Sequence, residues 1–159
     1  MRRDRLVLVV LAAVALVVLV VALGERRSHP GGSAVLASWT LTPGVLNPDV
    51  TQATIGQTIC VRGWTRTIRP PTDYTNELKR KQLAEYGLHG SLSSYQEDHL
   101  ISLELGGHPT DPGNLWPEPY PRAGDVDQIE NQLNDAVCSG RLTLAEAQRR
   151  ESELKHTQG

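Results

Sequence analysis

The longest hydrophobic stretch of the chain lies near its amino terminus, where residues 6–23 are apolar without interruption. A helix over these residues, rising 1.5 Å per residue, nearly spans a hydrocarbon core of about 30 Å. The arginines before the stretch slightly favour a cytoplasmic amino terminus. We predict that residues 1–24 form an uncleaved transmembrane anchor that leaves the rest of the chain outside the cytoplasm. Secretion after signal cleavage is the alternative, because Ala22 and Gly24 are small.

Polar and turn-forming residues follow this segment. Residues 25–41 include the sequence Pro-Gly-Gly-Ser and are predicted to form a flexible linker. Residues 42–155 carry shorter apolar patterns and are predicted to form one small domain. At its start, residues 57–61 and 64–68 are predicted to be short extended pieces that end before Pro70-Pro71.

A helical stripe comes next. Leu78, Leu83 and Tyr86 share one helix face and predict a helix from residue 72 or 73 to about residue 86. Gly87 follows at the position that glycine favours beyond a helix end.

The centre of the domain has the pattern of two strands. Residues 95–105 alternate as a strand does, and residues 114–116 are predicted to return as a second strand after a loop rich in glycine and proline. The alternation places Asp98 and His99 on opposite faces of the first strand. Both side chains can therefore serve one site only where that strand ends or bends.

Two helices are predicted to complete the domain. The first runs from residue 124 or 125 to Gly140, and it has an apolar face and a polar face of oxygen-bearing side chains. The polar face carries Asp127, Glu130, Asn131 and Asn134. It is either an ordinary solvated surface or a source of metal ligands. A structural terminal helix follows a capping box formed by Thr143 and Glu146, and the chain is expected to fray from His156.

The cysteine content affects both the core and the candidate chemistry. Hydrophobic residues make up 39% of the chain, and a large share of them lie before residue 24, so the domain has a modest core. Two cysteines cannot form a four-sulfur zinc site. In an exported domain Cys60 and Cys138 are predicted to form a disulfide.

The charge is unevenly distributed although the net charge is only −2. The charged residues within 62–81 are mostly basic, and those within 82–138 are mostly acidic. A basic strip beside an acidic block suits a phosphate-binding surface next to a cation site, and a solvated surface is the alternative. The cations predicted to contact nucleic acid are Arg62, Arg66, Arg69, Lys79, Arg80 and Lys81.

The order of these elements resembles that of HNH, or ββα-metal, nucleases. Asp98-His99 stands on the first predicted strand, Asn114 on the returning strand, and a helix follows. Residues 43–150 are also similar to a group of uncharacterised bacterial proteins that share the stretches Glu97-Asp98-His99-Leu100-Ile101 and Asn114-Leu115-Trp116-Pro117-Glu118. The resemblance implies an α+β fold with a small ββα-metal core and flanking helices, here preceded by the predicted transmembrane helix.

The resemblance also implies roles for single residues. His99 matches the general base, Asp98 the metal-binding acid, and Asn114 the residue that steadies the loop. The family completes its metal site with a histidine or asparagine on the helix, but the next histidine after Asn114 is His156. Asn131 is the best match for this third ligand, with Glu130 or Asp127 as substitutes.

The function implied is hydrolysis of phosphodiester bonds with little sequence specificity. One divalent ion, Mg²⁺ or else Mn²⁺, is expected because the candidate ligands are hard oxygen groups. The expected partners are nucleic acid, with DNA favoured over RNA, and a membrane through the amino-terminal helix; no protein partner is inferred. Two alternatives stay open: a non-catalytic, membrane-tethered envelope domain that retains the scaffold, and a metal-binding protein without nuclease activity.

Overall fold

A computed structural model describes residues 35–158 of the chain. These residues form one compact unit of mixed helices and a small sheet, which confirms the α+β class. The predicted anchor and most of the predicted linker lie outside the described residues. Within residues 35–158, none of the helices has the length and apolar character needed to cross a membrane.

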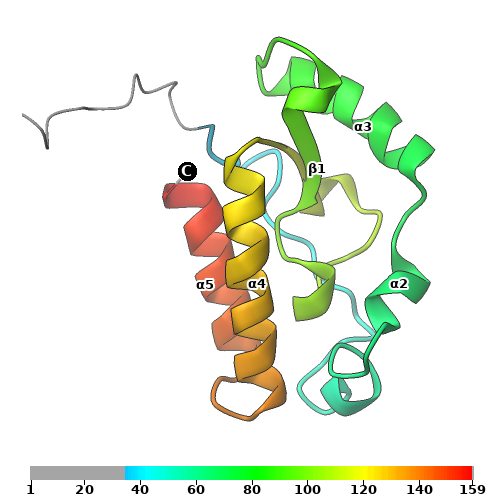
Figure 1. Cartoon of the computed structure of the whole chain (residues 1–159), viewed down its shortest axis with the longest axis vertical. Helices are drawn as coiled ribbons and strands as arrows, with labels where there is room; N and C mark the ends of the chain where they lie inside the picture. Colours follow the sequence, from blue (N-terminus) through cyan, green and yellow to red (C-terminus); the bar gives the residue numbers. More distant parts are fainter. Residues whose placement is uncertain (1–34, 159) are drawn as a thin grey trace, which may run out of the picture. The chain divides into compact units, whose positions relative to one another are not determined.

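Six elements make up the frame of the domain (Figure 1). They are α2 (Trp64–Ile68), α3 (Thr72–Glu85), β1 (Tyr95–His99), β2 (Leu115–Pro119), α4 (Arg122–Cys138) and α5 (Leu144–Thr157). Short 3-10 turns precede α2 and lie between α3 and β1 and between β1 and β2. The two strands form an antiparallel hairpin. Helices α4 and α5 run side by side on one side of the hairpin, and α3 lies on the other side (Figure 1).

The hairpin register places the candidate chemistry at the end where the loop connects the two strands. Tyr95 pairs with Pro119, and the ladder ends where His99 pairs with Leu115. Beyond that pair, the amide of Ile101 donates to the side chain of Asn114 instead of to a neighbouring strand. The predicted strand over residues 95–105 is therefore too long, and a 3-10 turn, η3 (Leu103–Leu105), replaces its last part.

Two apolar clusters hold these elements together. The larger cluster joins the segment before α2 to the turn η3 and to helices α4 and α5. Its buried members are Val50, Ile59, Ile101, Leu105, Leu133, Val137, Leu144 and Ala147. A smaller cluster of Ala37, Leu100 and Trp116 packs the start of the domain against the hairpin. The disulfide between Cys60 and Cys138 is present, with the two Cα atoms 5.5 Å apart, and it ties the end of α4 to the segment before α2.

The prediction of extended structure before α3 is wrong. Residues 55–57 form the 3-10 turn η1 (Ile55–Gln57), and residues 64–68 form helix α2. Local hydrogen bonds explain the difference: the amide of Cys60 donates to Ile55 O, and the hydroxyl of Thr58 donates to Thr54 O. The predicted bounds of α3 are confirmed to within about one residue.

Both ends of the described domain are more tightly held than the sequence suggests. The predicted linker includes residues 35–41, but Ala37 is buried and its amide donates to the carbonyl of Lys155. The prediction that the chain frays from His156 is wrong, because this side chain is buried and stacks on Trp39 with ring centroids 3.6 Å apart. The two ends of the domain therefore stabilise each other.

Candidate functional site

His99 is the last residue of β1 and lines a cavity of about 420 Å³. Its Nε2 lies 3.0 Å from the carbonyl oxygen of Pro109. A carbonyl oxygen only accepts hydrogen bonds, so Nε2 carries the proton and Nδ1 is the unprotonated nitrogen of the neutral ring. Burial lowers the pKa of His99 below its ordinary value, so the imidazole is neutral at pH 7. The site therefore holds a histidine in the state that a general base requires.

Asn114 fixes the loop that supplies this carbonyl. Its Oδ1 accepts from the amide of Ile101, and its Nδ2 donates to the carbonyls of Ile101 and His108, all at 3.0 Å. The side chain is fully buried, so these bonds replace water contacts. This geometry matches the loop-steadying position that the resemblance gives to Asn114.

Gly107 makes that closure possible. A Cβ atom at this position would lie 1.7 Å from the carbonyl oxygen of Ile101 and 2.6 Å from Nδ2 of Asn114. The loop returns too close to the strand end for any side chain larger than hydrogen. Gly107 is thus needed for close backbone approach, whereas the sequence pattern indicates only a turn.

Three carboxylates meet in the same cavity as His99. Asp98 on β1 and the α4 residues Asp127 and Glu130 each offer an oxygen, and these oxygens lie within 4.8 Å of one another. Oxygens on opposite sides of one Mg²⁺ lie about 4.2 Å apart, since each bond is 2.0–2.1 Å long. Small side-chain rotations would bring the three onto one ion. The donor set is hard oxygen, which suits Mg²⁺ or Mn²⁺.

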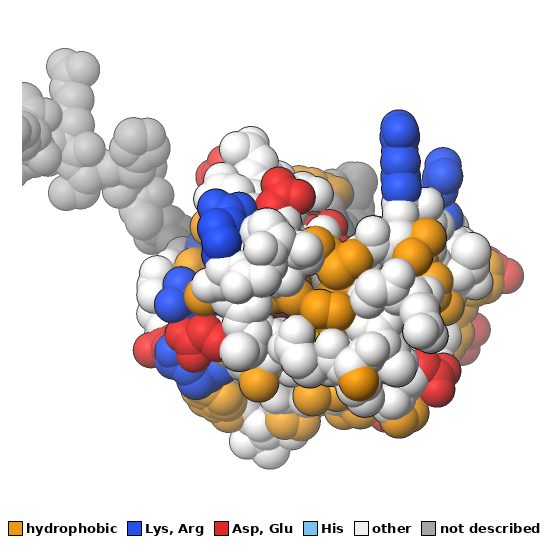
Figure 2. Space-filling model, turned by 90° about the horizontal axis from the view of Figure 1, so that it is seen from below, with side chains coloured by type: hydrophobic (Ala, Val, Ile, Leu, Met, Phe, Trp, Pro, Cys, Tyr) orange, Lys and Arg blue, Asp and Glu red, His pale blue; other side chains and the backbone are white. Residues whose placement is uncertain are grey.

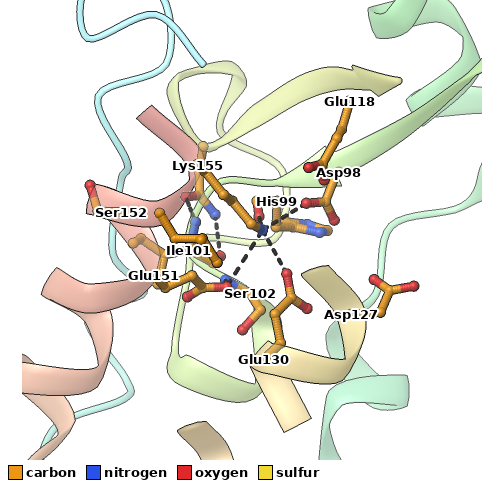
Figure 3. A network of polar contacts seen from close by, with 12 residues as sticks. Asp98, His99, Ile101, Ser102, Glu118, Asp127, Glu130, Glu151, Ser152 and Lys155 are labelled. Atoms are coloured by element: carbon orange, nitrogen blue, oxygen red, sulfur yellow. Dashed lines mark hydrogen bonds and ion pairs between the residues drawn. The ribbon is translucent and has the colours of Figure 1, made fainter. Parts of the chain in front are cut away.

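Lys155 on α5 occupies the inner side of this acid cluster (Figure 3). Its ammonium lies 2.7 Å from Oδ2 of Asp98 and 2.6 Å from Oε1 of Glu130, and it also donates to the carbonyl of His99. The carboxylate of Glu151 lies 3.5 Å from the same ammonium and accepts a hydrogen bond from the amide of Ser102. Lys155 is fully buried, so the cation is sealed between α4, α5 and the end of β1.

The charges of this network depend on one another. Burial disfavours charged Lys155, but the surrounding carboxylates raise its pKa well above the ordinary value. Burial also disfavours an ionised Asp98, yet the adjacent Lys155 ammonium holds the pKa of Asp98 below its usual range. Glu130 differs, because burial outweighs the same ammonium and raises its pKa. An ionised Asp98 facing a charged Lys155 is the stable centre of the network.

Glu118 adds an acid that the network does not neutralise. Its carboxyl group lies beside that of Asp98 (Figure 3) and is fully buried. Burial, together with the charge of Asp98, raises the pKa of Glu118 to about 8. Neither carboxylate oxygen of Glu118 accepts a hydrogen bond. Arg122, whose Nε lies 3.3 Å from Oε1, forms an ion pair with Glu118 without a hydrogen bond. A protonated Glu118 can donate a hydrogen bond to the neighbouring carboxylate of Asp98.

Two further acids line the cavity. Burial raises the pKa of Glu97 to about 8, and both of its carboxylate oxygens lack a hydrogen-bond partner. Burial, followed by the charge of Glu151, raises the pKa of Glu104 to about 7. Ser102 lines the same cavity, is buried, and has a hydroxyl without a partner. The cavity wall is thus rich in oxygen atoms that hold no partner within the described residues.

The helix residues predicted as the third ligand separate into two groups. Glu130 and Asp127, the substitutes, converge with Asp98. Asn131 lines the cavity, but its amide donates to the backbone carbonyl of Asp127 one turn earlier on α4. Asn134, on the same polar face, donates to the carbonyl of Glu104 and so holds η3 against α4.

The predicted nucleic-acid contacts do not form one strip. Arg69 lines the cavity beside His99, and Arg62 and Arg66 are exposed in the neighbouring segment. On the face shown in Figure 2, Lys and Arg side chains stand toward opposite edges, with apolar and uncharged side chains between them.

The cations on α3 have different environments. Lys79 is buried, and its ammonium donates to the carbonyls of Tyr95 and Leu92, which secures the start of β1. Arg80 is exposed, and Lys81 is exposed and paired with Glu77 at 3.2 Å. Arg69 is therefore the predicted cation that the structure brings to the candidate site.

Sequence reasoning missed Lys155, Glu118 and Glu151. A signal for the α5 residues exists: Leu144, Ala147, Glu151 and Lys155 follow one helix face, so an acid and a base occupy positions that the periodicity assigns to the core. Charged residues at core positions are buried only when they are paired. Their partners come from β1 and α4, which the local pattern of α5 does not reveal.

Comparisons with protein families, curated proteins and solved structures find no match for this chain. The resemblance to HNH nucleases thus rests on the quoted residues alone and stays a prediction.

Proposed function

We propose that the protein is a metal-dependent nuclease that hydrolyses phosphodiester bonds with little sequence specificity. One observation carries the proposal: a neutral, buried histidine shares a cavity with three converging carboxylates and an arginine. A phosphodiester hydrolase needs a base for water, a cation at the phosphate, and groups that hold the polyanion. The cavity contains residues suited to each task.

His99 is proposed as the general base. With Nε2 held by the carbonyl of Pro109, Nδ1 is the nitrogen that can take a proton from water. Taking that proton makes the ring cationic, and the ionised Asp98 next in sequence stabilises this charge. Asn114 acts through the loop and touches neither water nor substrate, so it is a positioning residue.

Asp98, Asp127 and Glu130 are proposed to hold one divalent ion, Mg²⁺ or Mn²⁺. Their oxygens lie within reach of a single ion, and the unpartnered hydroxyl of Ser102 lines the same cavity as a further polar group. A bound ion supplies charge stabilisation to the phosphate oxygens. Lys155 keeps Asp98 ionised and holds its Oδ2, which leaves Oδ1 as the oxygen for the ion.

The substrate proposed is nucleic acid bound through its backbone. Arg69 lies where it can contact a phosphate in the cavity, and the exposed Arg62 and Arg66 can contact phosphates further along a strand. These are contacts to the backbone and carry no sequence information, so low sequence specificity is part of the proposal. A location outside the cytoplasm on a membrane anchor, and DNA rather than RNA as substrate, remain parts of the same proposal.

One observation favours a second candidate, a non-catalytic envelope domain. The ammonium of Lys155 already contacts both Asp98 and Glu130, so two of the three carboxylates have a structural role without any metal. In that case the network would stabilise the fold, and the cavity would bind no divalent ion. Metal dependence separates the two candidates.

The test uses the full oxidised chain in detergent micelles, incubated with supercoiled plasmid DNA or with single-stranded RNA. Mg²⁺, Mn²⁺ or a chelator is added in parallel. The proposal expects cleavage with either ion and none with chelator, and the ratio of DNA to RNA cleavage identifies the preferred substrate. Folded protein that cleaves neither substrate with any divalent ion would support the envelope domain instead.

A further inference from the structure

Gln96 holds an unusual position at the candidate metal site. Its side chain lines the cavity, and its Nε2 lies 3.3 Å from Oδ1 of Asp98 and 3.3 Å from Oδ1 of Asp127. An amide NH₂ group carries two hydrogens, and each can be donated to one of these oxygens. The group that bridges the two carboxylates is therefore a neutral donor in the place where a cation would be attracted.

The other end of this amide is held by Tyr120. The phenol hydroxyl donates to Oε1 of Gln96 at 3.0 Å. A hydroxyl can donate or accept, so it can bond to either end of an amide. Turning the amide by half a turn about its last side-chain bond would exchange Nε2 and Oε1. Tyr120 would then accept from Nε2, and Oε1 would lie between the carboxylates.

The spacing of these atoms suits a metal ion. Adjacent ligands around an octahedral Mg²⁺ lie about 3.0 Å apart, because each bond is 2.0–2.1 Å long. The amide atom that faces the two carboxylates is 3.3 Å from each. With oxygen in place of nitrogen, the Gln96 amide needs to move only a few tenths of an ångström toward each carboxylate oxygen to be a ligand adjacent to both.

We propose that Gln96 is a ligand of the divalent ion and that its amide turns over when the ion binds, exchanging its two donated hydrogen bonds for a metal–oxygen bond. This inference rests on the metal site of the proposed function and adds a residue that the sequence did not single out. Amide oxygens are common ligands of hard divalent ions. The unpartnered hydroxyl of the buried Ser102 in the same cavity is an independent sign that the site takes a polar ligand.

Direct binding of Mn²⁺ to the full chain, followed by electron paramagnetic resonance, tests the proposal without relying on nuclease activity. Gln96→Met keeps an unbranched side chain and removes the oxygen, and we expect Mn²⁺ affinity to fall about tenfold or more. Gln96→Glu always presents oxygen and adds charge, so it should bind at least as tightly as the wild type. Gln128 is exposed on α4 next to Asp127 and does not line the cavity. Gln128→Met and Gln128→Glu are therefore the matched controls, and Gln128→Met should leave the affinity unchanged.

Nuclear magnetic resonance gives a second measurement. The side-chain NH₂ signal of Gln96, identified by its loss in Gln96→Glu, should shift strongly on addition of Mg²⁺ as it leaves the two carboxylates. If the wild type binds Mn²⁺ and Gln96→Met binds equally well, the Gln96 proposal fails while the metal site stands. If the folded wild type binds no Mn²⁺, both this proposal and the proposed function fail.

Discussion

The ammonium of Lys155 lies 2.7 Å from the carboxylate of Asp98, although the two residues are 57 positions apart in the sequence. This contact makes the last helix a part of the candidate site. It places a permanent positive charge on the inner side of the acids and leaves their outer oxygens toward the cavity. The site is thus assembled by the whole domain and not by the hairpin and α4 alone.

Removal of this charge should destabilise the domain strongly. Lys155→Met leaves Asp98 and Glu130 buried without their cation, and loss of one partner from a buried pair costs about 3–5 kcal/mol. The free energy of unfolding of the full oxidised chain, measured by urea denaturation, checks this. Lys79→Met is the matched control, because Lys79 is also buried but donates only to carbonyls, and it should cost about 1–3 kcal/mol. Equal losses in the two variants would contradict the account.

The loop that holds His99 should not tolerate a side chain at residue 107. Gly107→Ala sets a methyl group against the carbonyl of Ile101, which is backbone and cannot move aside. We expect a loss at or above the upper end of the ~0.5–3 kcal/mol usual for single substitutions. Gly124→Ala in α4 is the control, since a Cβ there meets no atom within 4 Å, and it should be neutral or stabilising. A thermal midpoint for Gly107→Ala equal to that of the wild type would refute the close approach.

The stability of the domain should fall as pH rises through the range in which Glu118 titrates. Its pKa is raised from 4.5 to about 8 on folding, so the folded state holds a proton that the unfolded state has lost. This contribution is fully present below the unfolded pKa and disappears as pH passes the folded pKa, with a slope of at most about 1.4 kcal/mol per pH unit. Glu118→Gln cannot titrate, so its unfolding free energy should decline less steeply between pH 5 and pH 8.

Glu146→Gln is the control for this pH dependence. Hydrogen bonds from Arg149 and Arg150 lower the pKa of the partly exposed Glu146 to about 2, so it stays ionised between pH 5 and pH 8 in both folded and unfolded chains. Its variant should keep the wild-type slope. If Glu118→Gln also keeps that slope, then Glu118 is not protonated in the folded protein.

Hydrophobic periodicity predicts the helices that bury one continuous apolar face. The stripe of Leu78 and Leu83 predicts α3, and the apolar face of Val126, Leu133 and Val137 predicts α4. The hairpin was also predicted, and its end at His99 explains how Asp98 and His99 share a cavity despite pointing to opposite faces of a strand. The residues before α3 were misread because local turns satisfy their backbone, a competition that hydrophobic pattern does not record.

The site was predictable only in part for a similar reason. Asp98 and His99 lie beside each other in the sequence, and Glu130 and Asp127 were kept as candidates because α4 has a polar face. Helical spacing could not decide between Glu130 and Asn131, since the choice depends on how α4 is rotated against β1. Lys155 and Gln96 could not be assigned to the site from the sequence, because each acts through partners on other elements.

The central claim is that His99 acts as the base of a metal-dependent nuclease. Nicking of supercoiled plasmid by the full oxidised chain in Mg²⁺ should be abolished by His99→Ala and retained in His89→Ala, because His89 is exposed and does not line the cavity. Circular dichroism confirms that both variants are folded. Equal nicking by the two variants, or by the wild type in excess chelator, would contradict the claim.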